Sequence, residues 1–325
     1  MPRFLRRAVV APAAVAIGLV AASPAASSGP DVTNPHVIAH FDLAAGQTPE
    51  NMVAERNGSV VVSFSAARQI AKVTRERRIR VLATLPAESR PKTPLVHDAV
   101  TLGLARAEDG TLYVNYATGT AKTGIWRIPA SGGAAEQIAA LPPDGVPNGL
   151  ALDERRGVLY AADSVLGTVW RVPLAGGTPT AWAAGGALDG LPETADGVGA
   201  NGIKVHKDAV WVTNSDRGTL LRIPVAADGS AGAAEERASG LPGVDDFVFP
   251  GHSDIVLAAL ITSNEVALVR PDGTRSTVLG VQDGLSNPTS LAVSGQDLFV
   301  ASDAYFTQRD PNLLKARLRA HFARP

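Results

Sequence analysis

The sequence predicts an all-β fold, a six-bladed β-propeller of four-stranded antiparallel blades. Short runs of β-branched and aromatic residues alternate with turns rich in Gly, Asp and Asn, which is the pattern of an antiparallel meander. This unit recurs, because the segment 147–174 has related copies that begin at 50, 102, 201, 245 and 289. Equivalent first positions follow one another in steps of 44 to 53 residues, which is the spacing of propeller blades. Six copies therefore predict six blades in one closed ring.

The first 28 residues have the composition of a secretory signal peptide. Three arginines near the start precede an apolar run, residues 8–22, and small residues suited to cleavage follow at 23–27. The apolar run is shorter than the roughly 20 residues that a membrane-spanning helix needs. We therefore expect a secreted, extracellular protein. The pair Arg6-Arg7 leaves twin-arginine export open beside the general pathway.

The composition narrows the possible partners. The chain has no cysteine, so no disulfide contributes to its stability, and 45% of its residues are hydrophobic, which is enough to build a core. Its net charge of −1 lacks the basic character of proteins that bind nucleic acid or anionic membranes. We expect a monomer whose partner is a small-molecule substrate, with no contact to nucleic acid or, in the mature form, to a membrane.

The order of the strands predicts how the ring closes. Each repeat supplies an outer strand before its inner, second and third strands. The segment 37–41 is such an outer strand, preceded by a linker at 29–36, and the propeller occupies 37–325. The chain ends on a third strand, 313–318, so 37–41 should complete the last blade and leave no long free edge. The alternative makes 311–322 a terminal amphipathic helix.

The first residues of the inner strands should form a ring at one mouth of the central channel. They are Glu50, Leu102, Asn148, Asn201, Asp245 and Thr289. Four of them offer carboxylate or amide oxygens, and such hard ligands favour Ca²⁺, although another divalent cation is possible. We therefore predict a metal site formed by Glu50, Asn148, Asn201 and Asp245. In the alternative interpretation, each polar residue only caps its own strand.

The histidines and loops are assigned by the same topology. His206 and His252 follow inner strands, so they should be solvated turn residues at the opposite mouth. His97 precedes the second inner strand and could line a pocket on the metal side. Substrate specificity should depend on loops such as 85–99 and 185–199. The tryptophan–arginine pairs of the third strands, such as Trp126-Arg127, are expected to serve packing.

The motifs Pro147-Asn148-Gly149-Leu150 and Ala200-Asn201-Gly202-Ile203 occur in register with Pro49-Glu50 and Asp245. In these motifs the chain resembles the family of senescence marker protein, gluconolactonase and luciferin-regenerating enzyme, within the calcium-dependent phosphotriesterase superfamily. The resemblance implies a six-bladed propeller in which Glu50, Asn148, Asn201 and Asp245 hold a divalent ion, commonly Ca²⁺.

Two departures from this family affect its finer implications. Val146-Pro147 stand where sugar lactonases often have an arginine, which weakens an aldonolactone assignment. The fifth motif contains two consecutive acids, so Asp246 is a rival to Asp245 as the ligand.

These observations predict a secreted, Ca²⁺-dependent hydrolase of lactones, esters or phosphotriesters. The ion would act as a Lewis acid, and Asp245 would be the catalytic base or the nucleophile. No Gly-x-Ser-x-Gly motif supports a serine hydrolase. The alternative is a non-catalytic binding or scaffold propeller with a structural ion, or a strictosidine-synthase-like scaffold. An open channel mouth would favour catalysis, and a mouth plugged by loops would favour a structural ion.

Overall fold

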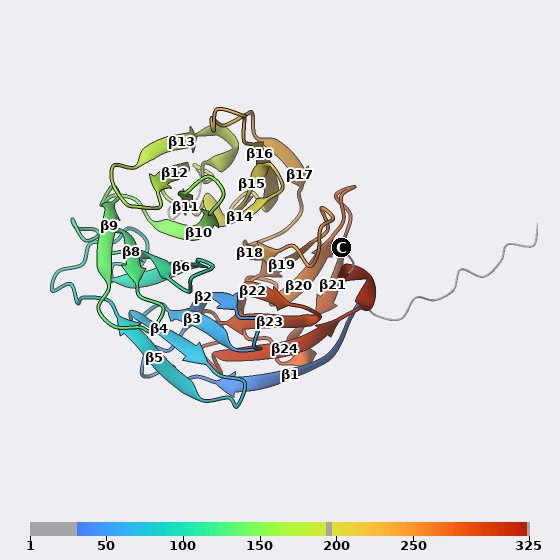
Figure 1. Cartoon of the computed structure of the whole chain (residues 1–325). Coiled ribbons are helices and arrows are strands. Elements are labelled where there is room, and N and C mark those ends of the chain that lie inside the picture. Colours follow the sequence, from blue (N-terminus) through green and yellow to red (C-terminus); the bar gives the residue numbers. More distant parts are fainter. Residues whose placement is uncertain (1–30, 193–196, 324–325) are drawn as a thin grey trace, which may run out of the picture.

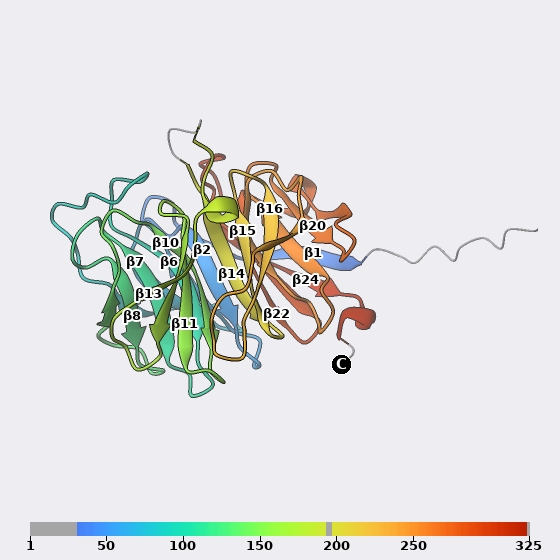
Figure 2. The same cartoon turned by 90° about the horizontal axis from the view of Figure 1, so that it is seen from above.

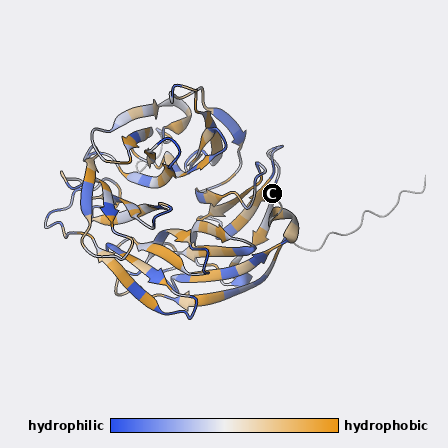
Figure 3. Ribbon diagram, in the orientation of Figure 1, coloured by the Kyte–Doolittle hydropathy of each residue, from blue (hydrophilic) through white to orange (hydrophobic). Residues whose placement is uncertain are grey.

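In the computed structural model, which describes residues 31–192 and 197–323, six four-stranded antiparallel sheets surround a central axis (Figure 1). The prediction of a six-bladed propeller is therefore confirmed. Hydrophobic and hydrophilic segments both occur in the sheets (Figure 3), and strands such as 60–64 and 256–260 are buried along their whole length. Within the described ranges, no helix is long and apolar enough to span a bilayer. The predicted signal peptide lies outside the described residues.

Each blade contains an inner, a second, a third and an outer strand, in that order from the axis. The inner strands are β2 (Pro49–Ala54), β6 (Val100–Arg106), β10 (Pro147–Asp153), β14 (Ala200–His206), β18 (Val244–Val248) and β22 (Pro288–Ser294). The second strands are β3 (Val60–Phe64), β7 (Leu112–Ala117), β11 (Val158–Asp163), β15 (Ala209–Asn214), β19 (Val256–Leu260) and β23 (Asp297–Ser302). The third strands are β4 (Gln69–Val73), β8 (Gly124–Ile128), β12 (Thr168–Pro173), β16 (Thr219–Pro224), β20 (Glu265–Val269) and β24 (Asn312–Leu318). The outer strands are β5 (Ile79–Thr84), β9 (Glu136–Ala140), β13 (Thr180–Ala184), β17 (Glu235–Ala238), β21 (Arg275–Leu279) and β1 (Val32–His40).

The ring closes by joining the two ends of the described chain. Strand β1 pairs antiparallel with β24 and completes the sixth blade, as the strand order predicted. The final segment is a strand followed only by the short 3-10 helix η3 (Ala320–Ala323), so the alternative of a terminal amphipathic helix is wrong. The expected linker at 29–36 is also corrected, because β1 begins at Val32. Residues 32–36 extend the pairing with β24 and shield its edge.

The core lies between neighbouring blades, where the apolar face of one sheet packs on the next. Val61 of blade 1, for example, packs in one buried cluster with Leu104 and Val114 of blade 2. Trp126 belongs to the same cluster and meets Tyr116 edge to face, which confirms its packing role. This packing holds the six inner strands around the central axis (Figure 1).

Candidate metal centre and substrate mouth

A β-bulge occurs near the start of each of the six inner strands. The six predicted ring positions fall at the same place in the strand pairing of their blades. In all six blades, the pairing between inner and second strand shifts over a short interval, such as Pro147 to Leu150. The ring residues lie inside these intervals: Glu50, Leu102, Asn148, Asn201, Asp245 and Thr289. A bulge leaves backbone groups unpaired and redirects side chains. The six positions named from the repeat are thus equivalent in the structure.

Side chains of the preceding blade donate hydrogen bonds to backbone carbonyl oxygens at or next to these bulges. Ser63 donates a hydrogen bond to the Leu102 carbonyl (2.7 Å), Asn115 to that of Asn148 (2.9 Å), and Thr213 to that of Asp245 (2.6 Å). Thr289 donates in the same way to the Pro49 carbonyl (2.8 Å). These contacts tie the beginnings of four inner strands to a neighbouring blade.

The glycine in each Asn-Gly motif is explained by the close approach of neighbouring inner strands. A side-chain carbon on Gly149 would meet the backbone of Asn201, and one on Gly202 would lie 2.6 Å from the Asp245 carbonyl oxygen. Only glycine fits at this spacing. The motif therefore reports backbone packing as well as a possible ligand.

The ring divides into four oxygen donors and two other residues. Asn201 and Asp245 are buried, with 5% and 7% of their surfaces exposed, whereas Glu50 and Asn148 remain partly exposed. Leu102 instead packs in an apolar cluster with Val100, Ala117 and Val146, and the Thr289 hydroxyl bonds to backbone.

The two ring carboxylates are near enough to repel each other. Burial, followed by the charges of Asp303 and Asp246, raises the pKa of Glu50 to about 8. Burial, followed by the charge of Glu50, raises the pKa of Asp245 well above its ordinary value, against a lowering hydrogen bond from Asn201. A cation at this point would offset that repulsion.

Asp303 is a third carboxylate at this mouth, and the sequence analysis missed it. It directly follows β23 and is buried, and its charge raises the pKa of both Glu50 and Asp245. Burial raises its own pKa to about 7. Ser164 and Ser215 hold the equivalent place after their second strands, where each hydroxyl binds the backbone of the next blade. An acidic residue at a position where two other repeats have serine was the feature of the sequence that could have indicated Asp303.

The hydrogen-bond partners of Asp246 bear on whether Asp245 or Asp246 is the candidate metal ligand. Both carboxylate oxygens of Asp246 contact Lys204 Nζ, at 2.5 and 2.7 Å. One of them also accepts hydrogen bonds from Asn51 (3.2 Å) and Ser290 (2.9 Å). Asp246 is thus fully engaged in a buried network, which favours Asp245 as the residue available to an ion.

The residues of the ring fit a hard cation. Asn201 Nδ2 donates to Ser215 Oγ (2.8 Å), while its Oδ1 is buried and has no hydrogen-bond partner in the described part of the chain. Two carboxylates and two amide oxygens suit Ca²⁺. No group of three or more His, Cys, Asp or Glu side chains in residues 31–192 and 197–323 is placed to hold a metal ion. The predicted set, with two carboxylates and two amides, is not a group of that kind.

A cleft of about 420 Å³ lies between loops that precede inner strands. It is lined by Pro94, Leu95 and His97 from the loop before β6 and by residues 189–191 and 197 after η1 (Gly186–Leu188). Its wall includes Val165, which packs against the cluster containing Leu102. The two loops project from one face of the ring (Figure 2). His97 therefore lines a pocket, as expected, and the role of these loops in substrate specificity stays a prediction.

His206 departs from its predicted environment. It is the last residue of β14, and its ring stacks on Phe249 with centroids 3.8 Å apart, so it is packed rather than solvated. The cause is a contact between blades 4 and 5 that no local pattern reveals. His252 is exposed in its turn, as expected.

Comparison with known proteins identifies the fold. No family model matches the sequence, and no curated protein matches it. A calcium-binding protein, regucalcin from Agrobacterium tumefaciens, is 17% identical with a TM-score of 0.63, over 88% of this chain and 96% of that one. A gluconolactonase from Xanthomonas campestris is 18% identical with a TM-score of 0.61, over 91% of this chain and 99% of that one.

The structure of this chain is also similar to that of an enzyme with a different chemistry. A virginiamycin B lyase from Staphylococcus aureus is 16% identical with a TM-score of 0.57, over 84% of this chain and 82% of that one. At such identities the likeness establishes the propeller fold that regucalcin and gluconolactonase share, and the activity must be argued from the site.

Proposed function

We propose that this protein is a divalent-metal-dependent hydrolase of lactones, esters or phosphotriesters. Glu50, Asn148, Asn201 and Asp245 would hold the ion, and Ca²⁺ suits their oxygens best. The observation that carries the proposal is a pair of ring carboxylates in which the charge of Glu50 raises the pKa of Asp245, beside an Asn201 oxygen that has no hydrogen-bond partner among the described residues. A structural neighbour described as calcium-binding and another described as a gluconolactonase add support.

The mouth favours catalysis over a purely structural ion. Glu50 and Asn148 keep part of their surface exposed, and a cleft large enough for a small organic molecule includes Val165, which packs against the cluster of Leu102. A bound divalent cation would supply Lewis-acid polarisation of a carbonyl or phosphoryl oxygen. The Asp245 carboxylate, held beside Asn201, would either accept a proton from the attacking water or itself attack the substrate. Asn148 and Asn201 would orient the group without adding charge.

Two further proposals come from the sequence. Residues 1–28 would direct export, and the mature chain would act outside the cell as a monomer on a small molecule. Determination of the mature N-terminus and of the mass in solution by light scattering tests both.

The test combines calcium removal with two ring variants. We expect a chelator to lower the melting temperature of the wild type, because an ion bound only by the folded state stabilises it. On a panel of lactones, esters and phosphotriesters, Asp245→Asn should abolish turnover even at saturating Ca²⁺. Asn148→Ala should lose affinity for the ion but regain part of its turnover in excess Ca²⁺. Asp228→Asn removes an exposed turn carboxylate and serves as the charge-matched control.

The outcomes separate the competing functions. A protein insensitive to chelator in both stability and turnover would contradict the metal site. Calcium-dependent stability with no turnover on any substrate of the panel would instead favour the non-catalytic or scaffold propeller. Full activity of folded Asp245→Asn would exclude that residue as base or nucleophile.

A further inference from the structure

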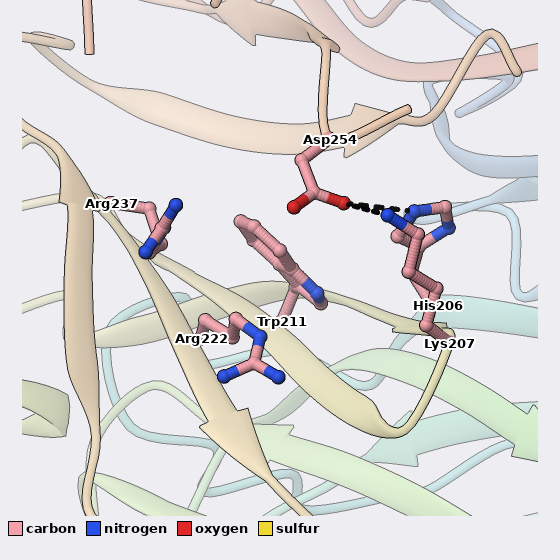
Figure 4. Close-up of a pocket in the computed structure, with 6 residues that line it drawn as sticks. All are labelled: His206, Lys207, Trp211, Arg222, Arg237 and Asp254. Atoms are coloured by element: carbon pink, nitrogen blue, oxygen red, sulfur yellow. Dashed lines mark hydrogen bonds and ion pairs between the residues drawn. The ribbon is translucent and has the colours of Figure 1, made fainter. Parts of the chain in front are cut away.

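A second cavity lies between blades 4 and 5 at the mouth opposite the metal ring. Its volume is about 190 Å³, and its lining residues are His206, Lys207, Trp211, Arg222, Arg237 and Asp254. Figure 4 shows the Trp211 indole between the two arginines on one side and the Asp254–Lys207 pair on the other. None of these residues belongs to the candidate metal centre.

Arg237 occupies a bulge position of the outer strand that is apolar in the other five blades of the described chain. Every outer strand has a bulged residue near its end, where its pairing with the third strand shifts by one position, and β1 has a second shift earlier in the strand. In five blades this residue is apolar and packs on a core cluster: Ile38, Leu82, Ile138, Trp182 and Val278. In blade 4 it is Arg237, which lines the cavity instead. Departures from a local pattern are expected at functional sites, which makes Arg237 a candidate for a binding role.

Arg222 belongs to a row of residues that pair across neighbouring strands. Trp211 pairs with Arg222, and Arg222 pairs with Glu235 across β15, β16 and β17. Blade 2 has the same row in Tyr113, Arg127 and Glu136. The row is therefore ordinary blade packing, and Arg237 is what blade 4 adds.

The cavity carries an excess of positive charge. Lys207 pairs with Asp254 at 2.6 Å, whereas Arg222 and Arg237 share one carboxylate, Glu235, at 3.1 and 4.0 Å. Three permanent cations thus face two carboxylates, and Glu235 is 45% exposed, so water screens its pairing. The guanidinium groups keep hydrogen-bond donors available on this side.

Trp211 forms a buried wall of the cavity. Trp211 is only 2% exposed, and its indole N–H has no hydrogen-bond acceptor among residues 31–192 and 197–323. Its packed ring gives the cavity a fixed wall beside the two guanidinium groups (Figure 4).

We propose that this cavity binds a small oxyanion, either a carboxylate or a phosphate group, through Arg237, Arg222 and the region around Trp211. Guanidinium groups match both anions with paired hydrogen bonds. The volume is below the several hundred Å³ of a drug-sized pocket, so it suits a single acidic group of a few heavy atoms. The site is independent of the metal centre, because the two lie at opposite ends of the inner strands.

Calorimetric titration of the full mature protein with sodium phosphate and with sodium acetate, at constant ionic strength in NaCl, tests this site. We expect saturable binding of at least one anion. Arg237→Leu, which restores the residue type found at this position in blade 1, should weaken it about tenfold or more while the protein stays folded. Arg127→Gln, in the matching row of blade 2, should leave the affinity unchanged.

The two anions also distinguish the ligand. Binding of phosphate alone points to a phosphate ester, and binding of acetate as well points to a carboxylate. The absence of saturable binding by either anion, or equal affinity in Arg237→Leu, would overturn the proposal.

Discussion

Gly202 tests whether the Asn-Gly motif is dictated by the approach of neighbouring inner strands. The Gly202→Ala substitution would place a Cβ 2.6 Å from the Asp245 carbonyl oxygen and 2.7 Å from Asp246 Cα. Ordinary van der Waals contact begins near 3.4 Å, so β14 and β18 would have to separate by about 0.8 Å. Both atoms belong to backbone, which a rotamer change cannot move.

The expected cost follows from this geometry. Overpacking a core costs roughly 1–3 kcal/mol, and a backbone clash belongs at the upper end, so we expect about 3 kcal/mol. That corresponds to a fall in melting temperature of roughly 6–12 °C for a large domain. The shift would also displace Asn201 and Asp245 relative to each other, so we expect a weaker apparent affinity for Ca²⁺.

Gly58 provides the matched control. It has a φ of +83° and nothing within 4 Å of an added Cβ, so Gly58→Ala costs only the backbone strain of about 1–2 kcal/mol. Thermal unfolding with and without Ca²⁺ should show a loss of calcium response for Gly202→Ala and none for Gly58→Ala. If Gly202→Ala were as stable as the wild type and kept the same calcium midpoint, the packing argument would be refuted.

Two other predictions concern buried charge. Lys204→Met should lower the free energy of unfolding by about 3 kcal/mol, because it leaves the buried Asp246 carboxylate without its cation. Denaturant unfolding measures this loss. Replacing Asp246 by Leu as well should recover part of the lost stability, and the absence of any recovery would argue against the ion pair. Burial, followed by the charge of Lys207, lowers the pKa of His206 in the folded protein. The unfolded state therefore binds a proton more readily at this residue, and the stability of the fold falls as the pH drops through the ordinary histidine pKa of 6.5. His206→Gln should therefore lose less melting temperature than the wild type between pH 7.5 and about 5.5, whereas an equal loss would exclude this contribution.

Repetition explains why much of the candidate centre was accessible from the sequence. Glu50, Asn148, Asn201 and Asp245 were aligned by counting residues within repeats, and the shared bulge confirms their equivalence. Repeat position also put His97 on the side of the ring where the cleft lies.

The sequence by itself determined the strands, their order, the six blades and the closure by β1 and β24, because these depend on local alternation and on a period visible along the chain. Contacts between blades decided the rest. The position of Asp303 near Glu50, the engagement of Asp246 by Lys204, the stacking of His206 on Phe249 and the cavity beside Arg237 all join side chains of different strands. The burial and charge around such groups depend on how neighbouring sheets pack, and that packing has no signature within a single strand.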